Sequence, residues 1–257
     1  MALINKLKNA VRPFLNNFRY KHNSGFCNIC EKNTIFFEFD EWLRDNYKCI
    51  RCGSIPRNRA LINAINTFYP EWKNLKIHES SPGGPVSEYF SEKAIHYNSS
   101  HFYPDVARGN YKGKYRSEDL TNLTFEGNSF DLFITSDVFE HVFNPDIAFR
   151  EIARVLKPGG AHIFTMPWYP SLSHSKRRAI LNGQKIELVM EPVYHGNPID
   201  EMGSLVTMDW GMDFCDFIYN SSGLATTVYL KKDRSLGLEA EFLEVFISRK
   251  APIQVDI

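Results

Sequence analysis

The chain has 257 residues, of which 43% are hydrophobic and 23% are charged. This composition excludes a disordered, collagen-like or low-complexity protein, and the length suits one α/β domain with a small additional module. No apolar stretch approaches the roughly 20 residues that a membrane-spanning helix needs. The N-terminus does not resemble a signal peptide, so we expect a cytoplasmic protein.

The formal net charge is zero, but the charges are unevenly distributed. Residues 1–59 contain eleven Lys and Arg against five Asp and Glu, a net charge of +6, and the remainder carries −6. This asymmetry indicates either an anionic partner for the N-terminal part or docking between the two parts. Arg57, Arg59 and the run Lys176–Arg178 either bind a phosphate or carboxylate, or remain solvated.

Residues 1–24 form a basic amphipathic segment. Leu3, Leu7 and Phe14 fall at helical spacing with Lys and Arg between them, although Pro13 interrupts a single long helix. The pattern fits peripheral contact with an anionic membrane surface, or packing of the segment on its own domain.

Four of the five cysteines fall in two close pairs. Cys27 and Cys30 form one C-x2-C, and Cys49 and Cys52 form the second after an interval of eighteen residues. This spacing is typical of a tetrahedral four-cysteine zinc site, with a redox dithiol or a disulfide pair as the alternative. Because the protein supplies all four ligands, the Zn²⁺ is expected to be structural, within a zinc ribbon at 25–56.

From residue 73 onward, strands and helices alternate, which predicts a parallel α/β sheet. The first strand of this series, Leu75–Glu79, leads through a Gly- and Pro-rich turn into a helix. A second strand is expected over Ala94–Asn98, and Phe130–Ser136 has the continuous apolar character of a buried strand. Other expected elements are strands over Thr34–Phe39, Lys114–Ser117, Ala161–Met166, Thr226–Leu230 and Phe242–Arg249, and helices over Pro56–Phe68 and after Asn144.

Two stretches carry a resemblance to a known family. Residues 128–142 have the sequence NSFDLFITSDVFEHV, and residues 147–164 have the sequence IAFREIARVLKPGGAHIF. Together they resemble the class I S-adenosylmethionine-dependent methyltransferases, in particular the type 11 small-molecule group. The resemblance covers roughly residues 73–250. It implies a Rossmann-like sheet of seven mostly parallel strands with an antiparallel last strand, and S-adenosylmethionine as cofactor.

The resemblance also implies where the cofactor binds. In the family, an acidic residue at the end of the first strand leads into a glycine-rich loop, and Glu79 and Gly83 fit these positions. Ser81 stands where the family has its first glycine. The family's second strand ends in an acid that binds the ribose, whereas this chain has Asn98 and Ser99. A neutral partner forms weaker hydrogen bonds than a charged one, so the chain departs from the family at both points.

Two further segments match cofactor-binding positions of the family. Asp119 and Leu120 match the pair that accepts the adenine amino group and packs against the ring. Ser136 and Asp137 match the residues that hold the methionine end of the cofactor. Each aspartate has an alternative explanation as a cap or turn residue.

Methyl transfer to oxygen or nitrogen requires the acceptor in line with the methyl group, and often a base that removes a proton. The candidate bases are His141, in the E-H pair, and His195, with Asp209 as a further candidate. His195 and Asp209 belong to an aromatic-rich insertion at about 167–215 within the 57–257 domain. Loops beyond the strand carboxyl ends form ligand crevices in open α/β sheets, so this insertion is expected to form the acceptor pocket.

The sequence therefore favours a methyltransferase that modifies oxygen or nitrogen of a small-molecule or sugar-like acceptor. Two alternatives stay open: an RNA methyltransferase whose zinc module contacts RNA, and a non-catalytic protein that retains the fold. The neutral overall charge is unfavourable for RNA binding, and the altered glycine loop is the evidence for the non-catalytic alternative.

Overall fold

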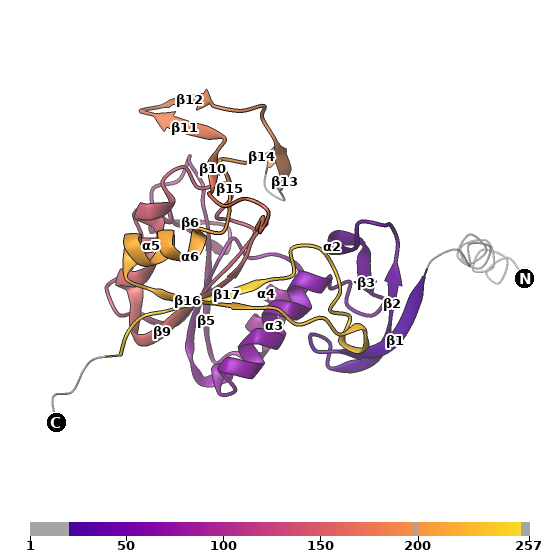
Figure 1. Ribbon diagram of the computed structural model, residues 1–257. Helices are drawn as coiled ribbons and strands as arrows, with labels where there is room; N and C mark the ends of the chain where they lie inside the picture. The colour runs from indigo at the N-terminus through magenta and orange to yellow at the C-terminus, as the bar shows by residue number, and fades with distance from the viewer. Residues whose placement is uncertain (1–20, 198–199, 253–257) are drawn as a thin grey trace, which may run out of the picture.

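The computed structural model describes residues 21–197 and 200–252. The predicted basic segment at 1–24 therefore lies almost entirely outside the described residues. Figure 1 shows a large sheet with helices on both faces and a small three-stranded sheet at one side. Within the described part of the chain, no helix is long and apolar enough to cross a membrane.

The large sheet confirms the predicted Rossmann-like architecture. Its strand order is β16-β17-β9-β8-β4-β5-β7-β6, with the central strands parallel and β17 antiparallel to β9. The sheet has one strand more than the seven predicted, because the short β6 forms a hairpin with β7. The strands are β4 (Lys76–Ser80), β5 (His96–His101), β6 (Tyr111–Lys112), β7 (Tyr115–Ser117), β8 (Phe130–Ser136), β9 (Leu156–Thr165), β16 (Ala225–Tyr229) and β17 (Val245–Arg249).

Alternating side chains divide the core into two halves. Along β8, Leu132 and Ile134 pack with two helices on one face, while Phe133 packs with two helices on the other. Helices α3 and α4 cover the first face, and α5 and α6 cover the second (Figure 1). The helices are α3 (Pro56–Phe68), α4 (Gly84–Lys93), α5 (Pro145–Val155) and α6 (Phe214–Ser222).

The small sheet brings the two cysteine pairs together. Its three antiparallel strands have the order β1-β2-β3, and the short helix α2 connects β2 to β3. The first strand begins at His22, before the expected boundary at residue 25. The elements are β1 (His22–Cys27), β2 (Lys32–Glu38), α2 (Leu43–Asn46) and β3 (Tyr47–Cys49).

Strand β1 packs against the loop that precedes β17. The Asn23 amide donates to the Arg234 carbonyl at 2.7 Å, across 211 positions of sequence. A Cβ atom at Gly25 would lie 2.1 Å from the Ser235 carbonyl oxygen, so only glycine permits this close approach. The loop contains a short 3-10 helix, η2 (Arg234–Leu236).

Arg59 joins the small sheet to the rest of the molecule. The side chain is fully buried and donates to the backbone carbonyls of Ser54, Tyr47 and Gly237. Its guanidinium carbon also lies 4.6 Å from the centre of the Phe36 ring. Burial lowers the pKa of Arg59 to about 10, so the side chain stays charged at neutral pH. The expectation that Arg59 binds a phosphate or is solvated was wrong, because its donors serve internal carbonyls.

Residues 167–215 project from the body of the protein as a set of hairpins (Figure 1). The base of the insertion is closed where the Tyr169 amide donates to the Trp210 carbonyl at 2.8 Å and the Trp168 indole donates to the Gly211 carbonyl at 2.7 Å. Because the insertion follows β9, it extends from the carboxyl edge of the sheet. Its strands are β10 (Lys176–Arg177), β11 (Ala179–Asn182), β12 (Lys185–Leu188), β13 (Tyr194–Asn197), β14 (Asp200–Leu205) and β15 (Met208–Asp209).

We predict that Arg59→Met lowers the free energy of unfolding by about 3 kcal/mol. The substitution leaves three buried carbonyls without this donor, and each unsatisfied buried group costs about 1–3 kcal/mol. Urea-induced unfolding measures the change. Arg150→Met, at an exposed position of α5, is the matched control and should change stability by less than about 0.5 kcal/mol. Equal stability of the two variants would contradict the bridging role of Arg59.

Candidate functional site

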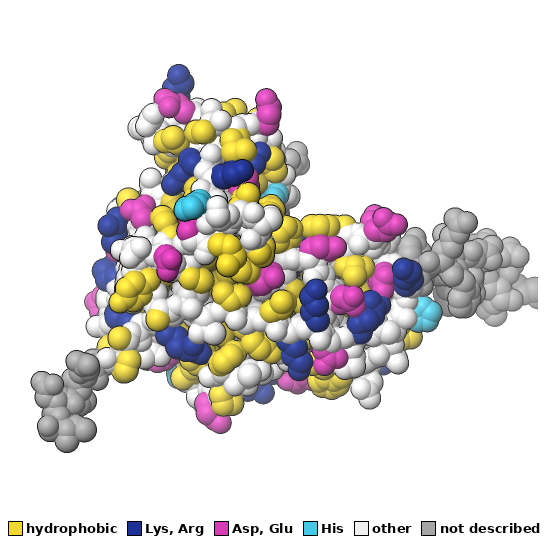
Figure 2. Space-filling model, viewed as in Figure 1, with side chains coloured by type: hydrophobic (Ala, Val, Ile, Leu, Met, Phe, Trp, Pro, Cys, Tyr) yellow, Lys and Arg dark blue, Asp and Glu magenta, His cyan; other side chains and the backbone are white. Residues whose placement is uncertain are grey.

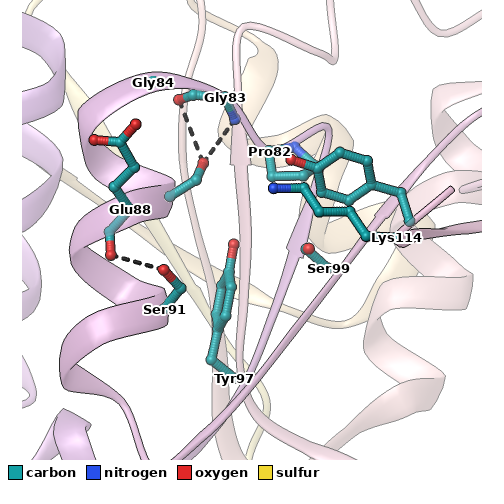
Figure 3. Close-up of a pocket in the computed structure, with 10 residues that line it drawn as sticks. Pro82, Gly83, Gly84, Glu88, Ser91, Tyr97, Ser99 and Lys114 are labelled. Atoms are coloured by element: carbon teal, nitrogen blue, oxygen red, sulfur yellow. Dashed lines mark hydrogen bonds between the residues drawn. The ribbon is translucent and has the colours of Figure 1, made fainter.

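The parallel strands β4, β5 and β8 end at one edge of the sheet, where ligands bind in open α/β folds. Glu79 lies at this edge and is only 3% exposed. Its carboxylate accepts hydrogen bonds from the Ser87 hydroxyl, at 2.9 Å, and from the Tyr97 phenol. The Ser87 hydroxyl in turn accepts from the Gly83 amide at 2.6 Å (Figure 3). Burial raises the pKa of Glu79 to about 7.

The turn between β4 and α4, which we call the glycine turn, comprises Ser81–Gly84. Ser81 has a φ of 60°, in the left-handed region that glycine adopts most readily. Serine therefore adopts here the backbone conformation that a glycine at this position would favour. Its amide donates to the Ser100 carbonyl at 2.7 Å. Gly83 is extended, and a Cβ atom there would meet nothing within 4 Å. The space beside the turn is therefore open.

A cavity of about 270 Å³ lies beside the glycine turn (Figure 3). Tyr97 and Ser99 line it from β5, Lys114 and Tyr115 line it from the β6–β7 hairpin, and Gly83 lines it from the turn. Two of the predicted cofactor residues, Gly83 and Ser99, therefore face one cavity. Ligand pockets commonly measure about 300–1,000 Å³, so this cavity suits one part of a nucleoside-containing cofactor.

Asn98 does not join this group. The register pairs His78 with Asn98 and Glu79 with Ser99, so Asn98 lies on the opposite face of the sheet from Glu79. Its amide oxygen contacts Nδ1 of the buried His78. The predicted end of the strand at Asn98 was wrong, because β5 continues to His101. The polar run N-S-S-H lacks the hydrophobic signal by which a strand is recognised.

Asp119 and Leu120 follow β7 at the same edge of the sheet. Asp119 Oδ1 accepts hydrogen bonds from the Thr121 amide and hydroxyl at 2.8 and 2.7 Å, which is the geometry of a turn residue. Leu120 is 9% exposed and packs in the core beneath α5. A contact of either residue with adenine stays a prediction.

Asp137, directly after β8, is held by two arginines near the small sheet. Arg44, on α2, contacts both carboxylate oxygens at 2.8 and 2.9 Å, and Arg57 Nε lies 3.0 Å from Oδ2. Thr165 donates to Oδ1 at 3.3 Å. Burial alone would raise the pKa of Asp137. The charges of Arg44 and Arg57 outweigh this effect and hold the pKa of Asp137 below its usual value. The carboxylate is therefore saturated by protein groups, and neither phosphate binding nor solvation describes Arg57. Ser136, the neighbouring predicted cofactor residue, ends β8 and is half-buried.

Arg177 and Arg178 also have partners within the protein, although the sequence suggested that they bind an anion or are solvated. Arg178 pairs with Asp209 at 2.7 Å, and Arg177 donates to the Phe143 carbonyl at 2.7 Å. Asp209, the further candidate base, is therefore engaged in an ion pair. We do not assign a catalytic role to Asp209.

The two candidate bases lie together beyond β8. The rings of His141 and His195 are 5.1 Å apart between centroids, and both approach the carboxylate of Glu140. The sequence interval of more than fifty residues between the histidines gave no sign of this contact. Glu140 belongs to the E-H pair but was not predicted as a site residue, because its burial is visible only in the fold.

The four paired cysteines form a compact cluster. Their sulfur atoms lie within 4.8 Å of one another, with Sγ separations of 3.7 Å for Cys27–Cys52 and 3.9 Å for Cys30–Cys49. All four are free thiols, and these distances far exceed a disulfide bond of about 2.05 Å. A tetrahedron of sulfurs around zinc, with bonds of about 2.3 Å, has edges of about 3.8 Å. The donor set and its size therefore fit a zinc ion.

Comparison with known proteins relates part of the larger domain to a known family. Residues 83–164 match the family model for a methyltransferase domain. A search of curated protein sequences gave no match. A chain in the complex between the Haloferax volcanii Trm112 methyltransferase activator and a candidate methyltransferase is 14% identical, with a TM-score of 0.50 over 78% of this chain and 92% of that chain.

Two other solved structures give similar values. An S-adenosylmethionine-dependent methyltransferase from Mesorhizobium loti is 19% identical, with a TM-score of 0.49 over 74% of this chain and 98% of that chain. CalS10, an amino pentose methyltransferase from Micromonospora echinaspora, is 14% identical, with a TM-score of 0.48 over 77% of this chain and 93% of that chain. Residues 83–164 match a methyltransferase domain, in agreement with the prediction from the sequence, and the matched region begins in the glycine turn.

We predict that Glu79 makes stability depend on pH. Its pKa in the folded protein is above the usual value of 4.5, so its stabilising contribution is present at low pH and is lost as the pH rises through about 7. Relative to Glu79→Gln, the natural protein should lose about 2–3 kcal/mol of unfolding free energy between pH 5 and 8.5. Urea unfolding across this pH range measures the difference. Glu92→Gln, on the exposed side of α4, should keep the natural slope; identical slopes for all three proteins would refute the assignment.

Proposed function

We propose that the protein transfers a methyl group from S-adenosylmethionine to a small-molecule acceptor. The observation that carries this proposal is the open glycine turn, which lies within the methyltransferase domain and faces a cavity. Helix α4 begins at this turn, so its backbone amides and dipole favour a negatively charged group of a ligand. The carboxylate of the cofactor's methionine moiety is such a group.

The cofactor proposal uses a subset of the predicted residues. Gly83 and Ser99 line the cavity and would contact the ribose, where the Ser99 hydroxyl replaces the acid of the family. Glu79, behind the cavity, holds the turn through Ser87 and does not need to touch the cofactor. Asp137 positions the end of β8 through its arginine partners. We keep Ser81, Asp119, Leu120 and Ser136 as proposed neighbours of the cofactor.

The acceptor is proposed to bind between the insertion and the carboxyl edge of the sheet. His195 reaches back from β13 to the segment after β8, so the insertion contacts this edge. Figure 2 shows hydrophobic side chains on the projecting hairpins and at their junction with the body. These side chains suit an acceptor with apolar surface, and His141 and His195 are the candidate groups for accepting its proton. Exposed apolar residues of the hairpins include Ile180, Leu181, Ile186, Leu188, Val189 and Met190.

The charge distribution favours a small molecule over RNA as acceptor. Three arginines of the basic N-terminal part, Arg44, Arg57 and Arg59, are engaged by groups of the protein. The positive charges of these three arginines therefore hold the N-terminal part against the rest of the protein. Figure 2 shows acidic and basic side chains interspersed on the visible face, whereas RNA binding needs a basic patch.

We also propose that the four-cysteine cluster binds one structural zinc ion. All four ligands come from the protein, so the ion would have no open position for catalysis. The Ser54 hydroxyl lies 3.2 Å from the sulfur of Cys52, and the Thr34 hydroxyl lies 3.4 Å from that of Cys49, so both can donate to thiolates. The ion would tie the end of β1 to the end of β3, the strand that follows α2, and would thereby help to hold Arg44 at Asp137.

We predict that the purified protein binds S-adenosylmethionine with micromolar affinity, measured by calorimetry. Gly83→Val should weaken binding at least tenfold without a change in melting temperature, because its backbone is extended and the new side chain would enter the open space. Ala225→Val, at an exposed position of β16, is the control. An absence of binding at millimolar cofactor in the folded protein would overturn the enzyme proposal and favour the non-catalytic alternative.

We predict one zinc ion per chain by elemental analysis. Cys49→Ser should lose the ion and lower the melting temperature, because metal-binding free energy contributes to folding free energy. Cys215→Ser, on α6 and away from the cluster, should retain zinc and should melt close to the natural protein. Retention of zinc and stability in Cys49→Ser would refute the structural zinc site.

A further inference from the structure

Glu140 is a buried carboxylate that lacks hydrogen-bond partners. The residue is 1% exposed, and neither of its two carboxylate oxygens has a hydrogen-bond partner among the described residues. Burial of an ionised carboxylate is unfavourable unless a cation or hydrogen-bond donors compensate its charge. The nearby cation Arg44 directs both terminal guanidinium nitrogens at Asp137. Among the described residues, Glu140 therefore lacks a hydrogen-bond partner, although its burial makes an uncompensated charge costly.

Two histidines face the carboxylate at distances between those of adjacent and opposite ligands of one ion. His195 Nδ1 lies 3.6 Å and His141 Nε2 lies 3.8 Å from Glu140 Oε1. Both distances are too long for hydrogen bonds. Neighbouring nitrogen and oxygen ligands with bonds of about 2.1 Å to one ion lie about 3.0–3.4 Å apart, and opposite ligands about 4.2 Å. One ligand atom from each residue can be chosen such that all three lie within 4.8 Å of one another.

The surrounding backbone orients two of these side chains. Nδ1 of His141 lies 2.9 Å from the Leu205 carbonyl, which only accepts hydrogen bonds, so Nδ1 carries the proton and Nε2 of the neutral ring has a free lone pair towards Glu140. Metal-binding histidines are commonly held in this way, with the second ring nitrogen donating to a carbonyl. The backbone carbonyl of Glu140 accepts a hydrogen bond from the Thr207 amide at 2.7 Å. This bond fixes the backbone from which the Glu140 side chain extends.

We propose that Glu140, His141 and His195 bind a divalent transition-metal or zinc ion, at a second site distinct from the four cysteines. Two imidazoles and one carboxylate suit ions from Mn²⁺ to Zn²⁺, and three protein ligands leave coordination positions open. The site lies after β8, at the edge where the proposed acceptor pocket meets the sheet. In a refinement that rests on the proposed function, an acceptor hydroxyl occupies an open position, where the ion lowers the pKa of that hydroxyl. The two histidines then serve as metal ligands and not as proton acceptors, and the proton of the hydroxyl leaves to solvent.

The test is a titration with Mn²⁺ of full-length protein that carries one equivalent of zinc, for the four cysteines, and no excess. Binding is followed by the loss of the free-ion electron paramagnetic resonance signal. Mn²⁺ prefers oxygen and nitrogen ligands, so it reports on this cluster and not on the cysteines. We expect one bound Mn²⁺ per chain. Glu140→Gln and His195→Ala should each weaken binding at least tenfold, whereas His174→Ala and Glu191→Gln, both at exposed positions of the insertion, should not change it.

The variants are chosen so that misfolding cannot imitate the result. His195 has a side chain that is 38% exposed, so its replacement by alanine should leave the melting temperature unchanged, and Gln is close in shape to Glu140. Absence of Mn²⁺ binding at millimolar concentration, or binding that both site variants retain, overturns the proposal and leaves a histidine–carboxylate ion pair. Binding of S-adenosylmethionine is measured separately, so failure of the metal site does not coincide with failure of the proposed function.

Discussion

The arrangement of the site depends on the ion pair between Arg44 and Asp137. Arg44 lies on α2, a helix of four residues that is too short to be stable by itself. Asp137 has a φ of 53°, a backbone conformation that surrounding contacts must maintain. Breaking a buried ion pair on one side costs about 3–5 kcal/mol, because the remaining charge is left uncompensated. The ion pair thus couples the position of a short helix to the position of the strand end beside the proposed cofactor.

This coupling connects the small sheet to the carboxyl edge of the large sheet. The cysteine cluster brings the end of β1 next to the end of β3, the strand that follows α2, and aromatic contacts extend the same interface. The Phe242 ring lies 6.1 Å from that of Trp42 and 5.1 Å from that of Tyr169, so it joins the segment before α2 to the start of the insertion. Three residues beyond Asp137, Glu140 faces the two histidines. A displacement of the small sheet would therefore alter the site, although no cysteine lines the cavity beside the glycine turn.

Local patterns predicted the elements that have strong local signals. The continuous apolar run of β8 and the helix that Pro56 begins were predicted with the observed bounds. The end of β5 was missed because its last residues are polar, although Ser100 and His101 are buried in the sheet. The hairpins of the insertion and α6 were not predicted as elements. Hydrophobic periodicity reports burial of a face, and it fails where buried residues are polar or where short strands remain exposed.

The site was predictable only where it followed the family resemblance. That resemblance selected Gly83, His141 and Asp137, but it did not indicate that Asp137 is bound by Arg44, 93 positions earlier in the chain. Arg59 shows the same limitation, because its carbonyl partner at Gly237 lies 178 positions away. Contacts of this kind leave no pattern in the sequence around either residue. They arise from the topology, which brings the N-terminal and C-terminal parts together.

The close approach of Gly25 to Ser235 has a consequence for biosynthesis. A ribosome adds about 5–20 residues each second, so roughly 10–40 seconds separate the synthesis of β1 from that of the loop on which it packs. During that interval the small sheet has no surface to dock on, and Arg59 lacks its partner at Gly237. The small sheet thus reaches its final environment only after the loop that precedes β17 has been translated.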